Sequence, residues 1–158
     1  MPPTPLTGLA QAIGNQPPFE ADALERFLGE ARISVLAYLR RDGTPHQVPL
    51  WFDFHHHEGF RFVVSTGSPK QRALQQRPAV SVIVHDDHPP HRAVLANGTV
   101  ELSVLDVGDE LTRTLAIRYL GLERGHQYMA AMRNSFQLTG TTLVRLRPKT
   151  IQAFDNTR

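Results

Sequence analysis

The sequence predicts a mainly β fold with helices (α+β), built as one antiparallel barrel with helical additions. Six segments alternate apolar and polar residues in the manner of strands. Glycines mark several of the turns between them, and helical apolar spacing occurs in the longer connections. With 158 residues and no internal repeat, the chain has the size of a single domain.

The N-terminal part is expected to be an arm followed by a helix. Segment 1–19 is rich in proline and predicts an extended arm outside the core, while 20–158 predicts the single domain. Helical spacing over Glu20–Glu30 predicts the first helix, and similar patterns over 111–120 and 128–132 predict helices late in the chain. The apolar positions of the first helix are Ala23, Leu24, Phe27 and Leu28.

Two predicted hairpins follow the first helix. Alternation over Ile33–Leu39 indicates a strand, and Asp42 with Gly43 is a strong signal for a tight turn. The returning strand contains Pro49, which has no N–H to donate to a neighbouring strand. That strand should therefore be an edge, a bulge or a place where another group approaches. A polar turn then leads into a strand over Phe60–Thr66.

Three further strands complete the predicted barrel. Val80–Val84 is almost continuously apolar, which predicts a strand buried on both faces. A long strand over Arg92–Leu102 is interrupted by Gly98, which indicates a bulge or a sharp bend. The last strand is expected over Gly140–Phe154, with a break near Pro148.

A basic turn and helix between two of these strands carries the clearest functional signal. Ser68 is a good N-cap, and Pro69 falls at the first helical position. Lys70 and Arg72 occupy the first turn, where the helix dipole disfavours cations unless an anion is bound. Hydroxyls, free N–H groups and two cations together predict a phosphate site. The alternative is an ordinary solvated basic turn.

Composition excludes several classes of function. Seventeen basic and fifteen acidic residues give a net charge of +2, which is too balanced to indicate a nucleic-acid partner. The absence of cysteine excludes disulfides and thiolate chemistry. We expect no metal site, because the histidine clusters at 55–57 and 85–91 lie in predicted turns. We expect a cytoplasmic protein, since no membrane span or signal peptide is recognisable.

Four motifs follow one another in a recognisable order: ISVLAYLRRDGTPHQVPLWFDF, STGSPKQRALQQRPAVSVIVHDD, HPPHRAVLANGTVEL and LVRLRPKTIQAFD. Together they resemble the split-barrel superfamily of pyridoxamine 5′-phosphate oxidase-like proteins. Within it, the chain looks closest to the flavin- and deazaflavin (F-420)-dependent oxidoreductases, often called nitroreductase-like. The resemblance spans about Ile33 to Asp155 and implies a six-stranded antiparallel split β-barrel, FMN-binding-protein-like. Ala73 departs from the pattern, since many members carry Asn there.

The resemblance also implies where a cofactor binds. In the family, the phosphate is held after the third strand and on the following helix, and the ring system lies along the second strand. The corresponding phosphate positions are Ser65, Thr66, Ser68, Lys70, Gln71 and Arg72, and the ring positions are Val48, Pro49, Leu50 and Trp51. A core aromatic is the alternative role for Trp51.

The implied activity is hydride transfer between deazaflavin coenzyme F-420 or FMN and a small planar or conjugated substrate. The implied assembly is a homodimer with the cofactor at the interface, where Arg92 is a further candidate contact. Arg77 and Arg92 are candidates for a basic groove that would favour the longer deazaflavin tail. The alternatives are an FMN-dependent pyridoxamine-phosphate-oxidase-like enzyme and a non-catalytic flavin- or tetrapyrrole-binding protein.

The sequence selects no catalytic residue. His46, His91 and Tyr128 are the candidates for the mouth of the site, and each is expected to be structural or exposed. Tyr119 and Tyr128 are expected to line a core or a dimer interface rather than a substrate channel.

Overall fold

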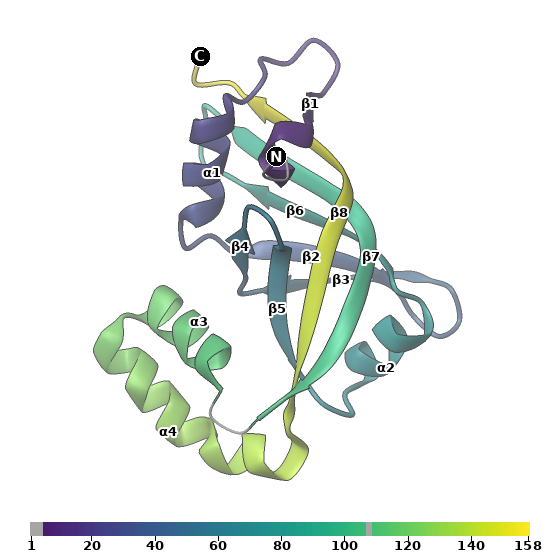
Figure 1. Cartoon of the computed structure of the whole chain (residues 1–158), viewed down its shortest axis with the longest axis vertical. Helices are drawn as coiled ribbons and strands as arrows, with labels where there is room; N and C mark the ends of the chain where they lie inside the picture. Colours follow the sequence, from purple (N-terminus) through teal and green to yellow (C-terminus); the bar gives the residue numbers. More distant parts are fainter. Residues whose placement is uncertain (1–4, 107–108) are drawn as a thin grey trace.

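The structure is a computed structural model that describes residues 5–106 and 109–158, and the side chains of these residues except 134–139. Its strands form one sheet in the order β3-β2-β6-β7-β8-β5-β4, and β1 pairs with β8 outside this path (Figure 1). The strands are β1 Ala10–Ala12, β2 Ser34–Leu39, β3 Pro45–Leu50, β4 Asp53–His55, β5 Gly59–Ser65, β6 Ala79–His85, β7 Arg92–Leu105 and β8 Thr141–Asp155. The helices are the 3-10 helix η1 Leu6–Leu9 and the α-helices α1 Ala21–Gly29, α2 Pro69–Gln76, α3 Glu110–Leu120 and α4 Leu122–Thr139.

This arrangement confirms the predicted fold class. The six predicted strands correspond to β2, β3, β5, β6, β7 and β8, and the short strands β1 and β4 are additional. Every described pairing is antiparallel except the one between β1 and β8. The strand order ends at β3 and β4, which are not paired with each other, so the barrel is split rather than closed. Of the three alternatives predicted for this strand, namely an edge, a bulge or a place where another group approaches, the structure shows the edge.

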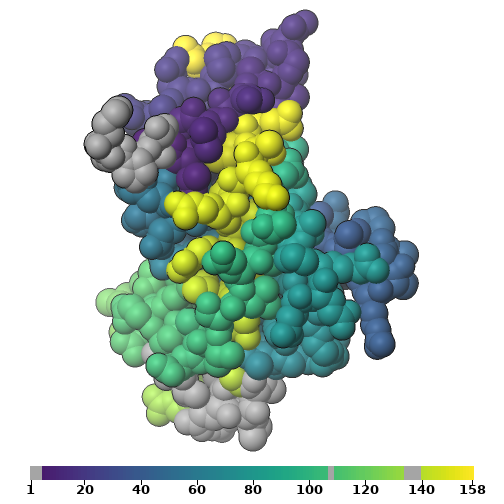
Figure 2. Space-filling view, turned by 45° about the vertical axis from the view of Figure 1, so that its right-hand side comes forward, coloured from purple at the N-terminus to yellow at the C-terminus, as the bar shows by residue number. Residues whose placement is uncertain are grey.

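The N-terminal segment packs against the sheet. Leu6 is 7% exposed and belongs to the hydrophobic core, and its N–H donates to the carbonyl of His56 at 2.8 Å. Figure 2 shows the segment, in purple, lying against β8, in yellow. For the described residues, the expectation of an arm outside the core is wrong, because Leu6 and β1 find partners far along the chain. Residues 1–4 of the predicted arm lie outside the described residues.

The core fills the inside of the curved sheet. Phe27, Phe52, Phe60 and Phe62 are among its fully buried side chains. Burying one large apolar side chain of this kind stabilises a fold by roughly 1.5–3 kcal/mol. Strand β6 contributes Val80, Val82 and Val84 to the core, whereas Ser81 and Ile83 on its other face are only half-buried. The prediction that this strand is buried on both faces is wrong, since its second face is only partly covered by the described residues.

The pairing of β7 with β8 is irregular at one point. Asn97 and Gly98 are adjacent on β7, but their partners on β8 are separated by Lys149. A Cβ at Gly98 would lie 2.9 Å from the carbonyl oxygen of Arg147, so the close approach requires glycine there. The predicted bulge at Gly98 is confirmed. The predicted break near Pro148 is this bulge within a continuous strand.

The helix pair α3 and α4 lies beside β5 and is fastened to the connection between α1 and β2 (Figure 1). The Arg118 guanidinium donates to the carbonyls of Leu28 and Glu30, at 3.2 and 2.6 Å. The Tyr119 hydroxyl donates to the carbonyl of Arg32 at 2.6 Å. Arg118 and Tyr119, which are consecutive residues of α3, therefore donate hydrogen bonds to backbone carbonyls that lie outside the strands. Among the described residues, no helix is long and apolar enough to cross a membrane.

Replacing Gly59 should disturb the pairing of β5 with β8. Its φ is +93°, and a Cβ there would lie 2.1 Å from the carbonyl oxygen of Leu146. Gly59→Ala should lower the free energy of unfolding by about 3 kcal/mol or more, because an unfavourable φ and a backbone clash act together. Gly67→Ala is the matched control, since φ there is +77° and no atom lies within 4 Å. We expect that control to lose about 1–2 kcal/mol in urea denaturation. Equal losses would show that the clash is absent.

Candidate functional site

A pocket of about 300 Å³ opens where the sheet fails to close. One wall comes from the end of β3 and the residue after it, and a second wall from the end of β5. The helix pair α3 and α4 supplies the third side. The lining residues are Pro49, Leu50, Trp51, Val63, Val64, Ser65, Thr112, Leu115, Tyr128 and Thr141. The pocket is thus largely apolar, with a few hydroxyl groups, as binding sites for flat organic molecules commonly are.

Trp51 and Tyr128 form an aromatic wall that gives the pocket its flat side, and Tyr119 supports Trp51 from behind. Trp51 stacks on Tyr119 with ring centroids 5.2 Å apart and planes 4° apart. Tyr128 is tilted against the indole at 5.3 Å and 55°. Trp51 is half-buried and lines the pocket, so it is not a core aromatic. The ring of Tyr128 also lines the pocket, and its predicted place at a dimer interface stays a prediction.

The hydroxyl of Tyr119 fixes the chain at the point where β3 ends. It accepts a hydrogen bond from the N–H of Phe52 at 3.1 Å and donates one to the carbonyl of Arg32. The carbonyl of Phe52 lies 3.1 Å from the same hydroxyl. Phe52 is fully buried, whereas Trp51, its neighbour, stacks on the Tyr119 ring at the pocket. Tyr119 therefore contacts both Phe52, which lies in the core, and Trp51, which lies at the pocket.

The edge strand β3 gives the pocket polar groups as well. It pairs with β2 only, so backbone groups along its other edge have no strand partner among the described residues. Such groups are available to hydrogen-bond a ligand. Of the predicted ring positions, Pro49, Leu50 and Trp51 line the pocket. The side chain of Val48 packs against the core instead.

Tyr128 is the titratable group in the pocket wall. Burial raises the pKa of its phenol, because the charged phenolate is less well solvated there than in water. The phenol therefore keeps its proton throughout the neutral range.

The turn before α2 is built as predicted, but the N–H groups of Gly67 and Ser68 already have hydrogen-bond partners within the turn and helix. The side-chain oxygen of Ser68 accepts a hydrogen bond from the N–H of Gln71 at 3.1 Å, which confirms the predicted N-cap. The N–H of Gly67 donates to the side chain of Gln71, and the N–H of Ser68 donates to the carbonyl of Ser65. The expectation that these N–H groups are free for an anion is wrong, because the turn satisfies them internally.

Lys70, in the first turn of α2, is a partly buried cation. It is half-buried, and burial lowers the pKa of its ammonium group. No carboxylate pairs with it in the part of the chain that the structure describes. Thr66, a predicted neighbour in the site, uses its hydroxyl in a bond with Thr142 at 2.7 Å. A bound anion would offset the cost of holding the Lys70 charge partly out of water.

Arg72 donates from its guanidinium to the carbonyl of Gly67 in this turn, and it also lines a second hollow of about 450 Å³ between α2 and the β2–β3 hairpin. We call this the basic hollow. Its lining residues are Tyr38, Arg40, Arg41, His46, Pro69, Arg72, Ala73 and Gln76. His46, a candidate for the mouth of the site, therefore lies in this hollow. It does not line the first pocket, with Trp51 and Tyr128 in its wall, which we call the aromatic pocket.

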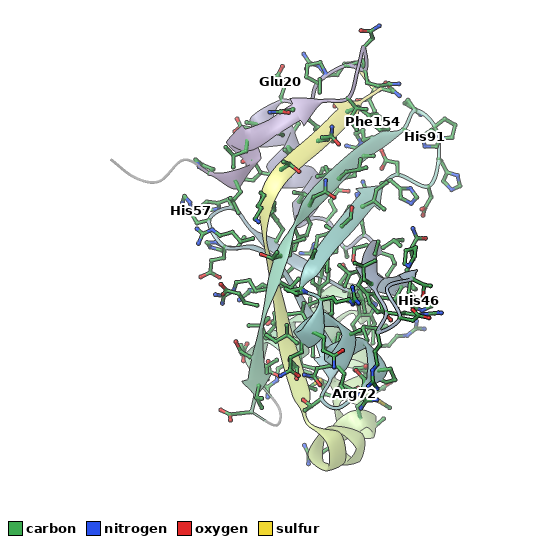
Figure 3. The ribbon with its side chains drawn as sticks, turned by 90° about the vertical axis from the view of Figure 1, so that its right-hand side faces the viewer. Glu20, His46, His57, Arg72, His91 and Phe154 are labelled. Atoms are coloured by element: carbon green, nitrogen blue, oxygen red, sulfur yellow. The ribbon has the colours of Figure 1, made fainter. Side chains whose placement is uncertain are left out.

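Arg92 is not brought together with the other predicted site residues. Its guanidinium pairs with Asp86 at 2.7 Å and lies 5.0 Å from the ring centre of Phe27. Figure 3 shows His91, the preceding residue, near the upper end of the molecule and Arg72 near the lower end. Within one chain Arg92 thus serves the packing of α1. Its predicted contact across a dimer interface stays a prediction, as does the groove with Arg77.

Sequence reasoning missed the far side of the pocket. Thr112 and Leu115 come from α3, and Thr141 comes from the start of β8. Their sequence neighbourhood reads as an ordinary amphipathic helix and strand, so no local signal marks them. In the part of the chain that the structure describes, no three His, Asp or Glu side chains converge as a metal site.

The paired Asp86 should make stability depend on pH. Its carboxylate bridges Arg92 and Arg32, at 2.7 and 2.5 Å, and these bonds lower its pKa, the Arg92 bond most. A carboxyl with a lowered folded-state pKa stabilises the fold above its unfolded pKa near 3.9, and the contribution is lost as pH falls through the folded value. Asp86→Asn should lower the free energy of unfolding by about 1–3 kcal/mol near neutral pH.

The loss caused by Asp86→Asn should shrink below about pH 4, where the wild-type carboxyl also becomes neutral. Urea denaturation at both pH values measures this. Asp42→Asn is the control, because that carboxylate is exposed and pairs only with Thr44. We expect a smaller effect there. A loss for Asp86→Asn that is independent of pH would show that the ion pairs contribute nothing.

Comparison with protein families identifies the relatives of this chain. The family model described as pyridoxamine 5′-phosphate oxidase matches residues 21–155. The chain belongs to this family. The match runs from α1 to the end of β8, which confirms the resemblance predicted from the four sequence motifs and extends it to the first helix.

Solved structures agree with this assignment. A conserved hypothetical protein from Mycobacterium tuberculosis is 21% identical, with 93% of this chain and 91% of that chain covered, at a TM-score of 0.69. An F420 reductase is 29% identical, with 80% and 94% covered, at 0.64. The heme storage protein HutZ from Vibrio cholerae is 19% identical, with 82% and 91% covered, at 0.57. The first and third show a shared fold alone. No curated protein matches.

Proposed function

We propose that this chain is an oxidoreductase that binds deazaflavin coenzyme F-420 or FMN along β3 and transfers hydride between it and a small planar or conjugated substrate. One observation carries the proposal. Strand β5 lines the aromatic pocket as far as Ser65, and the half-buried, unpaired cation of Lys70 follows five residues later. A flat apolar site whose wall leads within five residues of the chain to an uncompensated positive charge suits a ring system with a phosphate tail.

The pocket suits the ring. Its volume of about 300 Å³ lies at the lower end of the range usual for small-molecule sites, roughly 300–1,000 Å³. Leu50 and Val63 offer apolar surface, and Trp51 offers an aromatic face held rigid by Tyr119. The free edge of β3 offers backbone donors and acceptors for the heteroatoms of a flavin-type ring.

The residues of the chain have limited chemical tasks in this proposal, since the cofactor supplies the hydride chemistry. The aromatic wall orients the ring, and helices α3 and α4 exclude water from one side of the pocket. The phenol of Tyr128 holds its proton because burial raises its pKa, so it is the candidate donor to a substrate atom.

The deazaflavin coenzyme is the preferred choice because the F420 reductase shares 29% identity with this chain over 80% of its length. A tetrapyrrole carrier is the second candidate raised by the sequence. In the described pocket wall, no His, Cys or Met is available as a ligand to haem iron, and burial keeps the proton on the phenol of Tyr128, the remaining candidate ligand. These residues favour a flavin-type ring over a haem in that pocket. We also propose a homodimer whose second subunit completes the open side of the site.

The proposal is tested by spectroscopic titration with F-420 and with FMN, followed by oxidation of the reduced cofactor in the presence of quinones, nitroaromatics or biliverdin. We expect saturable binding and turnover with at least one substrate class. Preferential binding of FMN with turnover would instead support a pyridoxamine-phosphate-oxidase-like enzyme. Binding without turnover would support a carrier, and no binding of either cofactor would contradict the proposal.

The titration of Lys70 gives a test that does not depend on activity. The chain has two lysines, Lys70 and the exposed Lys149, so NMR of isotope-labelled lysine side chains should resolve both. Without ligand, the pKa of Lys70 should lie below that of Lys149, because burial disfavours its charge. A bound phosphate should raise the pKa of Lys70 and leave that of Lys149 unchanged.

Mutation of the same residue should separate binding from folding. Lys70→Met should weaken FMN and F-420 binding about 10-fold or more, since it removes a charged contact. It should not lower stability without ligand, because the folded state disfavours the charge that is removed. Lys149→Met is the matched control and should change neither quantity. Unchanged affinity in Lys70→Met would reject Lys70 as the phosphate contact.

A further inference from the structure

We infer that Thr141 is a specificity-determining residue of the aromatic pocket. Its hydroxyl donates a hydrogen bond to an uncharged carbonyl or nitro oxygen of the flat molecule that binds there, and a molecule without such an oxygen loses that contact. The inference rests on the proposed function and deepens it, because it names the polar group that the ring or the substrate must carry. Thr141 is the first residue of β8 and lines the pocket.

Thr141 is a buried polar residue whose hydroxyl is not used by the fold. Only 4% of the residue is exposed. Among the described residues, its hydroxyl has no hydrogen-bond partner. Buried polar groups without a partner are uncommon in native structures. Water that enters the pocket can hydrate this hydroxyl, so a ligand that displaces the water loses affinity unless it replaces the hydrogen bond.

The small exposed part of Thr141 includes its hydroxyl. In the described part of the chain, the side-chain polar atoms that are fully enclosed and lack a partner are nitrogen atoms of Arg32, His57, Arg118 and Arg145. The oxygen of Thr141 also lacks a partner but is not among these enclosed atoms, so it keeps accessible surface. Because the residue lines the pocket, we place that surface in the pocket wall.

The neighbours of Thr141 form a polar end of the pocket. Thr141 pairs with Ser65 of β5, and residues that lie directly across from each other on neighbouring strands place their side chains on the same face. Ser65 also lines the pocket. Two residues earlier on β5, Val63 adds apolar surface. The wall therefore changes from apolar to polar where β5 ends and β8 begins (Figure 1).

The other buried hydroxyl of the described pocket wall has already given its proton to an internal hydrogen bond. Thr112 is 7% exposed, and its hydroxyl donates to the carboxylate of Asp109 at 2.6 Å. An ionised carboxylate only accepts hydrogen bonds, so the Thr112 hydroxyl has only lone pairs left for a ligand. The same carboxylate caps α3 by accepting from the N–H of Thr112 at 3.0 Å, which fixes this arrangement. Thr141 therefore keeps the donor that Thr112 lacks.

The wall around Thr141 favours an uncharged acceptor. Among the described residues that line the pocket, none carries a charge at neutral pH. A carboxylate or phosphate brought to Thr141 would lose its water without meeting a cation in that wall. A carbonyl or nitro oxygen loses less hydration and gains a hydrogen bond from the hydroxyl. Quinones, conjugated ketones and nitroaromatics carry such oxygens, and so do flavin-type rings.

Thr142, the next residue of β8, provides a matched control. It is 2% exposed, and its hydroxyl lies 2.7 Å from the hydroxyl of Thr66. Thr142→Val leaves the Thr66 hydroxyl without this partner and should lower the Tm of the protein without ligand by about 2–6 °C. Thr141→Val removes a hydroxyl that has no protein partner, so the Tm should be unchanged or higher.

The experiment measures binding through Trp51, which is the only tryptophan of the chain and lines the pocket. Its fluorescence is titrated with 1,4-naphthoquinone and with naphthalene, two flat molecules that differ in their carbonyl oxygens. We expect Thr141→Val to bind naphthoquinone about 5-fold or more weakly than wild-type protein and to bind naphthalene equally well. Thr141→Ser, which keeps a hydroxyl, and Thr142→Val should bind both molecules as wild-type protein does.

The dissociation constants of F-420 and FMN for the same variants identify the source of the oxygen. A loss for naphthoquinone alone assigns it to the substrate, and a loss that includes a cofactor assigns it to the ring. If Thr141→Val weakens neither naphthoquinone nor a cofactor, or weakens naphthalene as much as naphthoquinone, the inference is overturned and the proposed function stands. If neither cofactor binds wild-type protein, the proposed function fails, whereas a selective loss of naphthoquinone would still support the role of Thr141.

Discussion

The hydroxyl of Tyr119 is the contact on which the site depends. The chain leaves β3 after Leu50 and must place Phe52 in the core before β4 begins. That step leaves the N–H of Phe52 without a strand partner, and the hydroxyl of Tyr119 accepts a hydrogen bond from it. The same ring supports Trp51 from behind. One side chain of α3 therefore closes the core, ends the edge strand and sets the flat wall of the pocket.

The two ends of the molecule differ in how their cationic side chains are paired with carboxylates. Near α1, Asp86 neutralises Arg32 and Arg92, and both guanidinium groups also lie over the ring of Phe27. Near α2, Lys70 and the arginines of the basic hollow have no such partners among the described residues. An unpaired cation that is partly removed from water costs folding free energy. Lys70 is half-buried and carries that cost, which an anionic ligand would offset, whereas Arg40, Arg41 and Arg72 are exposed.

Local signals predicted much of the structure. Ser68 with Pro69 predicted the start of α2, Asp42 with Gly43 predicted the first hairpin, and Gly98 predicted the bulge. These features depend on residues close in sequence, so their chemistry is readable there.

Features that depend on contacts between residues far apart in the sequence could not be predicted from it. Leu6 is buried because the β4–β5 turn and β8 receive its segment, and Arg92 is engaged by an aspartate that the sequence does not single out. The family resemblance predicted Pro49, Leu50 and Trp51, which line the pocket, whereas the wall from α3 emerged only from the tertiary structure. The most direct measurement is a crystal structure of the protein with F-420 or FMN. The account predicts a ring in contact with Trp51 and a phosphate oxygen within hydrogen-bond distance of the Lys70 ammonium. A ligand bound elsewhere, or a phosphate that does not contact Lys70, would contradict it.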